Sequence, residues 1–212
     1  MPTRTFLFVD QVGSTEQLSR LGDQDGHALR TALFDLLRQA SQLSGGEEVD
    51  FTGDGLFCAF EGAAEAVAAS VAMQQLVWSF NRRQPAERQI GIRVGLNTGE
   101  PLESEGGGYF GVAVVVAARL CSAAGRGQVL VADVVQSLVA PRGVHGFKSI
   151  GPLQLKGIAG PVNVFAVDWE PDERVAAFPR ALTMARSGPF VGRNRESAAV
   201  MDAWEAVLVL QG

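Results

Sequence analysis

Residues 5–15 read TFLFVDQVGST and carry the strongest local signal for the fold of this chain. Residues 5–10 form an unbroken apolar run that ends in Asp10, which predicts a strand buried on both faces or at the centre of a sheet. Gly13 permits a sharp turn, and Ser14 or Thr15 can cap a following helix. Backbone N–H groups at the start of that helix could hold phosphate oxygens, and they belong to Val12, Gly13, Ser14 and Thr15.

Strands and helices alternate along the residues that follow. We expect a helix over 26–44, strands over 48–52 and 56–60 joined by the turn Gly53-Asp54-Gly55, a helix over 66–80, a strand over 89–97, a helix over 111–124, a strand over 128–132, a short helix over 134–139 and a closing strand pair over 148–155 and 162–169. The valines of 114–116 favour a strand, but the length of 111–124 and its end at Gly125 favour a helix. The order βαββαβ with extra C-terminal elements predicts a mixed sheet covered by helices on one face.

Composition narrows the class of protein. The chain has 212 residues, of which 47% are hydrophobic and 19% are charged, as in a packed globular protein. Its net charge of −5 gives no reason to expect nucleic-acid or membrane-surface binding. The apolar runs are too short for a membrane helix, and the N-terminus does not resemble a signal peptide. Cys58 and Cys121 lie in apolar segments and cannot build a disulfide framework, so we expect a reducing, cytoplasmic setting.

The sequence divides into three parts. Residues 1–169 carry all of the regular pattern and are expected to form one domain. Residues 170–187 contain Pro171 and Pro179 and show no sustained periodicity, which is typical of a linker. Residues 188–212 restart with an apolar helical pattern but are too short to bury a core of their own. We therefore expect them to be the truncated start of a following domain.

Two aspartates are the first candidates for chemistry. Asp10 ends the first strand, and Asp54 lies in the turn between the next two strands. If those strands are neighbours, both carboxylates project from the same end of the sheet. Such a pair beside a glycine-containing turn suits Mg²⁺ with a bound polyphosphate. The alternative is that each aspartate only caps or turns the chain.

Five blocks in order carry a resemblance to a known family. They are FVDQVGST, TGDGLFCAF, IGIRVGLNTGE, YFGVAVVVAARL and LKGIAGPVNVF, and together they cover about residues 4–168. In this order and spacing they resemble the catalytic domain of class III adenylyl and guanylyl cyclases. The resemblance implies an α/β (α+β) fold with a ferredoxin-like core. It also implies a head-to-tail homodimer or heterodimer whose active sites lie between the two domains.

The resemblance assigns roles to particular residues. It implies that Asp10 and Asp54, with the Gln11 carbonyl, bind two Mg²⁺ or Mn²⁺ ions that hold ATP or GTP. Arg119 would stabilise charge at the α-phosphate, and Lys156 would contact the terminal phosphates. Without the resemblance, Arg119 would be interpreted as one half of an ion pair on a helix surface and Lys156 as part of a solvated turn.

Three positions depart from the family pattern. Adenylyl cyclases have a Lys where this chain has Asp50, and an Asp or Thr where it has Gly108. The Asn that orients the ribose is replaced by Val115, which cannot donate a hydrogen bond, and loss of one such group costs about 10²–10³ in rate. Asp50 partly resembles the Glu of guanylyl cyclases and could accept hydrogen bonds from guanine.

Two functions therefore stay open. One is a weak nucleotidyl cyclase, converting a nucleoside triphosphate to a 3′,5′-cyclic nucleotide and pyrophosphate in signalling. The other is an inactive pseudo-cyclase that senses nucleotide or dimerises to regulate an attached domain. The segment PFVGR at 189–193 resembles the entry to ATPase domains that follow cyclase domains. His27 and His145 lack the spacing of a zinc site, and Cys58 is expected to be inert core.

Overall fold

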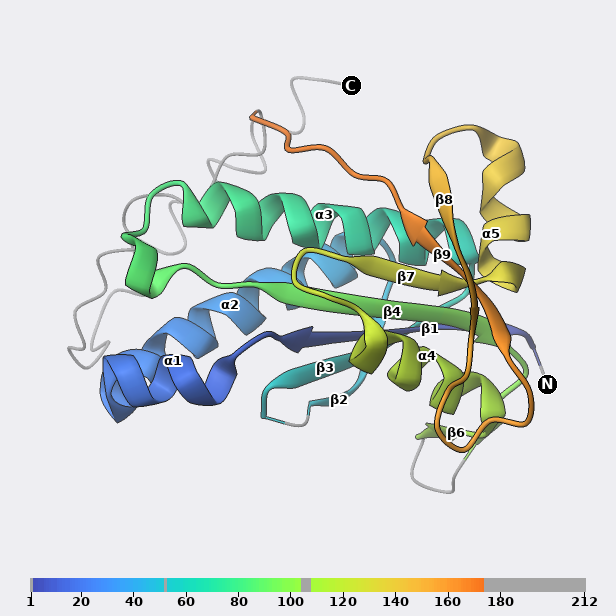
Figure 1. Ribbon diagram of the computed structural model, residues 1–212, viewed down its shortest axis with the longest axis horizontal. Helices are drawn as coiled ribbons and strands as arrows, with labels where there is room; N and C mark the ends of the chain where they lie inside the picture. The colour runs from blue at the N-terminus through green and yellow to red at the C-terminus, as the bar shows by residue number, and fades with distance from the viewer. Residues whose placement is uncertain (1, 52, 104–107, 174–212) are drawn as a thin grey trace, which may run out of the picture. The chain divides into compact units, whose positions relative to one another are not determined.

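The structure is a computed structural model and describes residues 2–51, 53–103 and 108–173 (Figure 1). Its strands are β1 (Arg4–Gln11), β2 (Glu47–Phe51), β3 (Gly55–Phe60), β4 (Ile92–Gly99), β5 (Leu102–Glu103), β6 (Tyr109–Phe110), β7 (Val129–Ala132), β8 (Phe147–Leu153) and β9 (Val162–Val167). Its helices are α1 (Ser14–Leu21), α2 (Asp23–Leu43), α3 (Ala63–Asn81), α4 (Val112–Ala123) and α5 (Asp133–Val139), with single 3₁₀ turns η1 (Ala86–Arg88) and η2 (Ala140–Arg142).

One mixed sheet organises the chain. Its strand order is β2-β3-β1-β4-β7-β9-β8, and a separate small ribbon pairs β5 with β6. Neighbouring strands are antiparallel in the part of the sheet made of β2, β3, β1 and β4. Together with α2 and α3, these four strands form the βαββαβ core of a ferredoxin-like fold. β7 then adds parallel to β4, and β9 and β8 close the sheet as an antiparallel pair. The ferredoxin-like prediction is therefore confirmed.

Helices cover both faces of the sheet, so the expectation of a single covered face is wrong. On one face, Phe6, Phe57 and Ala59 pack with Val114 and Ala117 of α4. The residues between them in the strands face the other way, and Cys58 contacts Ser41 of α2. Figure 1 shows α4 on the opposite side of the sheet from α2 and α3. The cause lies in β1. Its apolar side chains alternate between the two faces of the sheet, so helices must pack on both faces to bury them.

A glycine allows α4 to lie close to the sheet. A Cβ atom at Gly95 of β4 would overlap the backbone nitrogen of Cys121 and approach the carbonyl oxygen of Ala117. Any side chain at this position would push the helix away from the strand. The close approach places the C-terminal end of α4 directly over β4, next to the end of β1.

Several element bounds differ from expectation, and α3, for example, begins at Ala63 rather than at Ala66. A separate helix α1 precedes α2, and α2 begins at Asp23 rather than at Gly26, which lies inside it. β4 spans Ile92–Gly99, two to three residues later than the predicted strand, because Ile90 bonds to Asn81 instead of joining the ladder. The short strands β5 and β6 were not predicted. The segment 111–124 is helical, as predicted.

The start of the expected linker packs against the domain. Gln75 of α3 donates to the Glu170 carbonyl over 2.9 Å, and Arg82 pairs with Glu173. The indole Nε1 of Trp169 donates to the Gly127 carbonyl. The rest of the expected linker and the expected start of a following domain, 174–212, lie outside the described residues. Among the residues described, no helix is long and apolar enough to cross a membrane.

Candidate active site

Asp10 and Asp54 come together at one end of the sheet. β1 and β3 are antiparallel neighbours with Asp10 opposite Gly55, which brings the β2–β3 turn beside the end of β1. The backbone N–H of Gln11 donates to the Asp54 carbonyl over 3.1 Å and fixes this arrangement. The sequence predicted this convergence from the position of each aspartate at a strand end, on the condition that the strands are neighbours.

The turn after β1 lies against Asp54. Gly13 has φ +72°, a left-handed conformation that favours glycine, and it leads directly into α1. No side chain caps the first turn of α1, so its backbone N–H groups point out of the helix end. The Ser14 hydroxyl donates to Asp54 Oδ2 over 3.4 Å. The predicted phosphate-binding segment is therefore next to the two carboxylates. The expectation for Val12 is wrong, because its N–H donates to the Gly91 carbonyl over 2.8 Å, and the N–H groups that remain candidates are those of Gly13, Ser14 and Thr15.

An arginine that the sequence analysis did not single out faces Asp10. Arg93 lies opposite Asp10 in the β1–β4 ladder, and its Nε donates to Asp10 Oδ2 over 2.8 Å. Its other amino groups contact the same carboxylate oxygen and the Ser122 carbonyl at the end of α4. The side chains of Asp10 and Arg93 are 23% and 31% exposed, so the ion pair is partly shielded from solvent. One signal was present, since Arg93 is the charged residue between apolar neighbours on a strand expected to be half-buried.

Asp50 lies on the same face of the sheet as Asp10. It stands opposite Phe57 in the β2–β3 ladder, and the ring of Phe57 stacks on that of Phe8 at 4.3 Å. The Asp50 side chain is exposed and accepts a hydrogen bond from the backbone N–H of Phe51. Phe51 points to the opposite face, where it contacts Phe34 and Arg38. Asp50 is therefore available to a ligand on the α4 side of the sheet.

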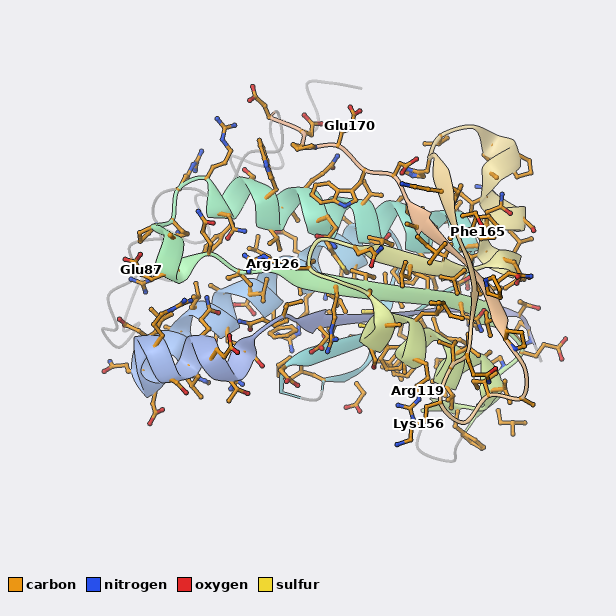
Figure 2. All side chains as sticks on the ribbon, in the orientation of Figure 1. Glu87, Arg119, Arg126, Lys156, Phe165 and Glu170 are labelled. Carbon is orange, nitrogen blue, oxygen red and sulfur yellow. The ribbon has the colours of Figure 1, made fainter. Side chains whose placement is uncertain are left out.

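The two predicted cations form a second group. Arg119 on α4 donates from Nε to the backbone carbonyl of Lys156 over 3.2 Å, and both side chains are exposed. Figure 2 shows the two side chains next to each other. Val115 lies one turn before Arg119 and is 39% exposed, so the same helix face that carries the cation also carries this apolar side chain. Gly108 directly precedes β6 and is half-buried.

Burial shifts the pKa values of three further titratable side chains, those of Cys58, Cys121 and His145. Burial raises the pKa of the Cys58 thiol to about 11 and that of Cys121 to about 12, which fits the prediction that Cys58 is inert. Burial lowers the pKa of His145, which lies with Asp168 and Trp169 in a cavity of about 490 Å³. Within the described part of the chain, no three His, Cys, Asp or Glu residues gather as metal ligands. A metal at Asp10 and Asp54 would therefore need further oxygen ligands from backbone or substrate.

The family follows from comparison with known proteins. The model of the adenylate and guanylate cyclase catalytic domain matches residues 2–168. The chain belongs to this family. It is 32% identical over 177 residues to the Rhizobium meliloti (strain 1021) protein "Putative adenylate cyclase 3", an alignment that covers 82% of this chain and 29% of that protein. The chain spans about a fifth to a third of the length of the curated relatives it matches.

Solved structures agree with the fold of this cyclase-family domain. The adenylate/guanylate cyclase/hydrolase from Silicibacter pomeroyi superposes with a TM-score of 0.69 at 29% identity, over 80% of this chain and 97% of that one. The guanylate cyclase domain of RhGC from Catenaria anguillulae, solved with GTP, superposes with a TM-score of 0.66 over 79% of this chain and 97% of that one. At 20% identity, this similarity supports the fold alone.

Proposed function

We propose that this cyclase-family domain binds a nucleoside triphosphate with Mg²⁺ or Mn²⁺ and retains a weak activity that forms a 3′,5′-cyclic nucleotide and pyrophosphate. The observation that carries the proposal is the convergence of Asp10 and Asp54 beside the uncapped first turn of α1. That corner offers carboxylates for a cation and backbone N–H groups for phosphate oxygens. Ser14 joins the two parts through its hydrogen bond to Asp54.

The donor set fits a hard divalent cation. Asp10 and Asp54 supply carboxylate oxygens, and the Gln11 carbonyl is the backbone candidate, which are ligand types that Mg²⁺ prefers. A bound ion would supply charge neutralisation and activation of the ribose hydroxyl. The guanidinium of Arg93 pairs with Asp10, so a bound ion would share this carboxylate with a positive charge. These ligand types support the proposal that the corner holds the metal that the family resemblance implies.

The proposed reaction joins two atoms of one substrate. The ribose 3′-oxygen attacks the α-phosphorus and loses its proton to solvent, and the bond from the α-phosphorus to the bridging oxygen breaks, releasing pyrophosphate. Negative charge increases on the α-phosphate oxygens in the transition state, where a fixed guanidinium such as that of Arg119 is stabilising. Lys156 would hold the departing phosphates as a point charge.

A complete site is proposed to need two copies of the domain or one copy with a related partner. Arg119 contacts Lys156, and Asp10 lies by Asp54, but within the described residues no hydrogen bond or ion pair links the two groups. The face of α4 beside Arg119 exposes Val112 and Val115, at 69% and 39%. Apolar side chains on the surface that carries catalytic cations suit a head-to-tail interface. Each site would then combine the carboxylates of one copy with the cations of the other.

The second candidate is an inactive pseudo-cyclase that binds nucleotide to regulate an attached ATPase-like domain. Val115 favours it, because an apolar side chain stands one helical turn from Arg119, where the family has an amide. Gly108 favours it as well, because it offers no side chain to a base. Under this alternative the carboxylate corner still binds metal and nucleotide, but no cyclic product forms.

One assay distinguishes the two candidates. The purified chain is incubated with ATP or GTP, each with Mg²⁺ and with Mn²⁺, and cyclic nucleotide is measured against an Asp54→Ala control. Product that depends on Asp54 supports the weak cyclase. Metal-dependent nucleotide binding without product supports the pseudo-cyclase, and absence of both contradicts the proposed function.

A further inference from the structure

Two buried glutamines lie behind the turn that leads into α1. Gln11 on β1 and Gln17 on α1 are each 6% exposed. Gln11 Nε2 donates to Gln17 Oε1 over 2.5 Å, and Gln17 Nε2 donates to the Gln89 carbonyl over 3.2 Å. The side chain of Gln11 points to the face of the sheet that α2 and α3 cover, away from the Asp10 carboxylate. The amide pair therefore acts on the candidate site through the backbone, that of Gln11 itself and that of residues 12–15.

The direction of these hydrogen bonds is determined at one end. The Gln89 carbonyl can only accept, so Gln17 must present its NH₂ group there and its oxygen to Gln11. Gln11 must then present its NH₂ group to Gln17, which leaves Gln11 Oε1 buried without a hydrogen-bond partner in the structure. An unsatisfied buried oxygen is costly, and a pair of apolar side chains would fill the same space without that cost. Packing alone therefore does not explain this amide pair.

The amide pair holds the first turn of α1. The backbone N–H of Gln17 bonds to the Gly13 carbonyl and closes the turn that contains Ser14 and Thr15. The side chain of the same residue ties this turn to the Gln89 carbonyl. On the other side, the N–H of Val12 bonds to the Gly91 carbonyl over 2.8 Å. Both ends of the proposed phosphate-binding turn are thus attached to the segment that leads into β4.

A second attachment lies one turn further along α1. Arg20 donates to the Glu87 carbonyl over 2.9 Å, and Figure 2 shows Glu87 beside α1. Arg20 is exposed, so its bond to the carbonyl competes with water and holds the helix less firmly than a buried bond. Gln17 is the buried attachment and the one that belongs to the first turn. Its loss should affect the turn more than the loss of Arg20.

We propose that Gln17, oriented by Gln11 and tied to the Gln89 carbonyl, is a positioning residue that sets the Gly13–Thr15 turn for the phosphates of a bound nucleotide. This inference rests on the proposed function, since it concerns the phosphates of the same metal–nucleotide complex. Gln17 does not touch the ligand. It acts through the backbone, so its loss should weaken contacts to phosphate and leave contacts to the base unchanged.

Calorimetry on three variants tests the proposal with Mg²⁺–GTP and with Mg²⁺–tripolyphosphate, which has phosphates but no base. We expect Gln17→Leu to weaken both ligands about tenfold, as for the loss of about one hydrogen bond. Gln75→Leu is the matched control, because it removes a similar amide-to-carbonyl bond on α3, and it should bind as the wild type does. The double variant Gln11→Leu/Gln17→Leu should recover thermal stability because no buried amide remains, but it should not recover affinity.

Two results would overturn the proposal. One is wild-type affinity in a folded Gln17→Leu variant. The other is a double variant that recovers affinity together with stability, because Gln17 would then only fill the core. If the wild type binds neither ligand, the proposed function fails, and amide hydrogen exchange decides the positioning claim separately. The Gln17 N–H should then exchange about tenfold faster in Gln11→Ala than in Gln75→Leu, and equal rates would refute it.

Discussion

Asp10 and Arg93 stand directly opposite each other on β1 and β4, and the guanidinium of Arg93 pairs with the carboxylate that we propose as a metal ligand. The positive charge of Arg93 therefore lies beside the carboxylate that a metal ion would share. A metal ion must compete with this charge. The same contact orients the carboxylate and would reduce its affinity for the proposed ion.

The first prediction concerns this competition. Arg93→Gln should bind Mn²⁺ more tightly than the wild type in the absence of nucleotide, by about tenfold at low salt, because a positive charge beside the ligand is removed. Calorimetry or the electron paramagnetic resonance of free Mn²⁺ measures the change. Arg38→Gln is a suitable control, because Arg38 pairs with Glu48 on the other face of the sheet. Unchanged or weaker Mn²⁺ binding in Arg93→Gln would contradict the arrangement.

The second prediction concerns the base. Asp50 is exposed on the α4 side of β2 and can accept from guanine N–H groups, so GTP should bind about tenfold more tightly than ATP. Asp50→Ala should remove this preference, whereas Glu48→Ala, which changes a carboxylate on the opposite face, should keep it. Competition binding with both nucleotides measures the ratio. A preference for ATP in the wild type would show that Asp50 does not contact the base.

The third prediction distinguishes a weakened enzyme from one that has changed its role. The triple substitution Asp50→Lys, Gly108→Asp and Val115→Asn should create or raise adenylyl cyclase activity, because only base recognition and ribose orientation depart from the family pattern. The effects should be cooperative, with Val115→Asn alone giving little, since an unrecognised base leaves the ribose misplaced. Cyclic AMP is measured for each single and combined variant. A triple variant that folds, dimerises and binds ATP without product would favour the regulatory pseudo-cyclase.

The sequence predicted the fold well because the signals were local and strong. The apolar run ending in Asp10, the Gly53-Asp54-Gly55 turn and the long amphipathic helices each specify an element without knowledge of the others. The same run predicted a strand buried on both faces or at the centre of a sheet, and β1 lies inside the sheet with α4 packed on one face. The expectation of one covered face was wrong because the sequence around Val114–Val116 does not state which side of the sheet its helix packs against.

The site was only partly predictable for a different reason. Asp10 and Asp54 were predictable from their positions at a strand end and in a turn, and Arg119 and Lys156 from blocks that resemble a family. Arg93 and Gln17 were not, because their roles depend on partners 83 and 72 residues away in the chain. Such pairs follow from strand register and helix docking, which are tertiary features. A charged or amide side chain next to a buried strand was the only local sign of either.

The fourth prediction concerns the two thiols. Burial holds the pKa of Cys58 near 11 and that of Cys121 near 12, so both should resist thiol reagents at pH 8 in the folded chain and react fully after unfolding. The unfolded thiols ionise near pH 9, before the folded ones. Stability from these groups is therefore complete below pH 9 and is lost as the pH rises toward 11 and 12. Chemical denaturation from pH 8 to 10.5 should show this decline, and Cys58→Ala/Cys121→Ala should reduce it.

The fifth prediction tests the central claim, that Asp10 and Asp54 together hold a metal–nucleotide complex. The most direct measurement is calorimetric titration of Mg²⁺–GTP into the wild type, Asp10→Ala and Asp54→Ala, with Glu48→Ala as a carboxylate control on the opposite face. Each aspartate variant should stay folded by circular dichroism and lose at least about 100-fold in affinity, because a cation bound by two carboxylates is left with one. The control should bind as the wild type does. Unchanged Mg²⁺–GTP affinity in both folded aspartate variants would contradict the account.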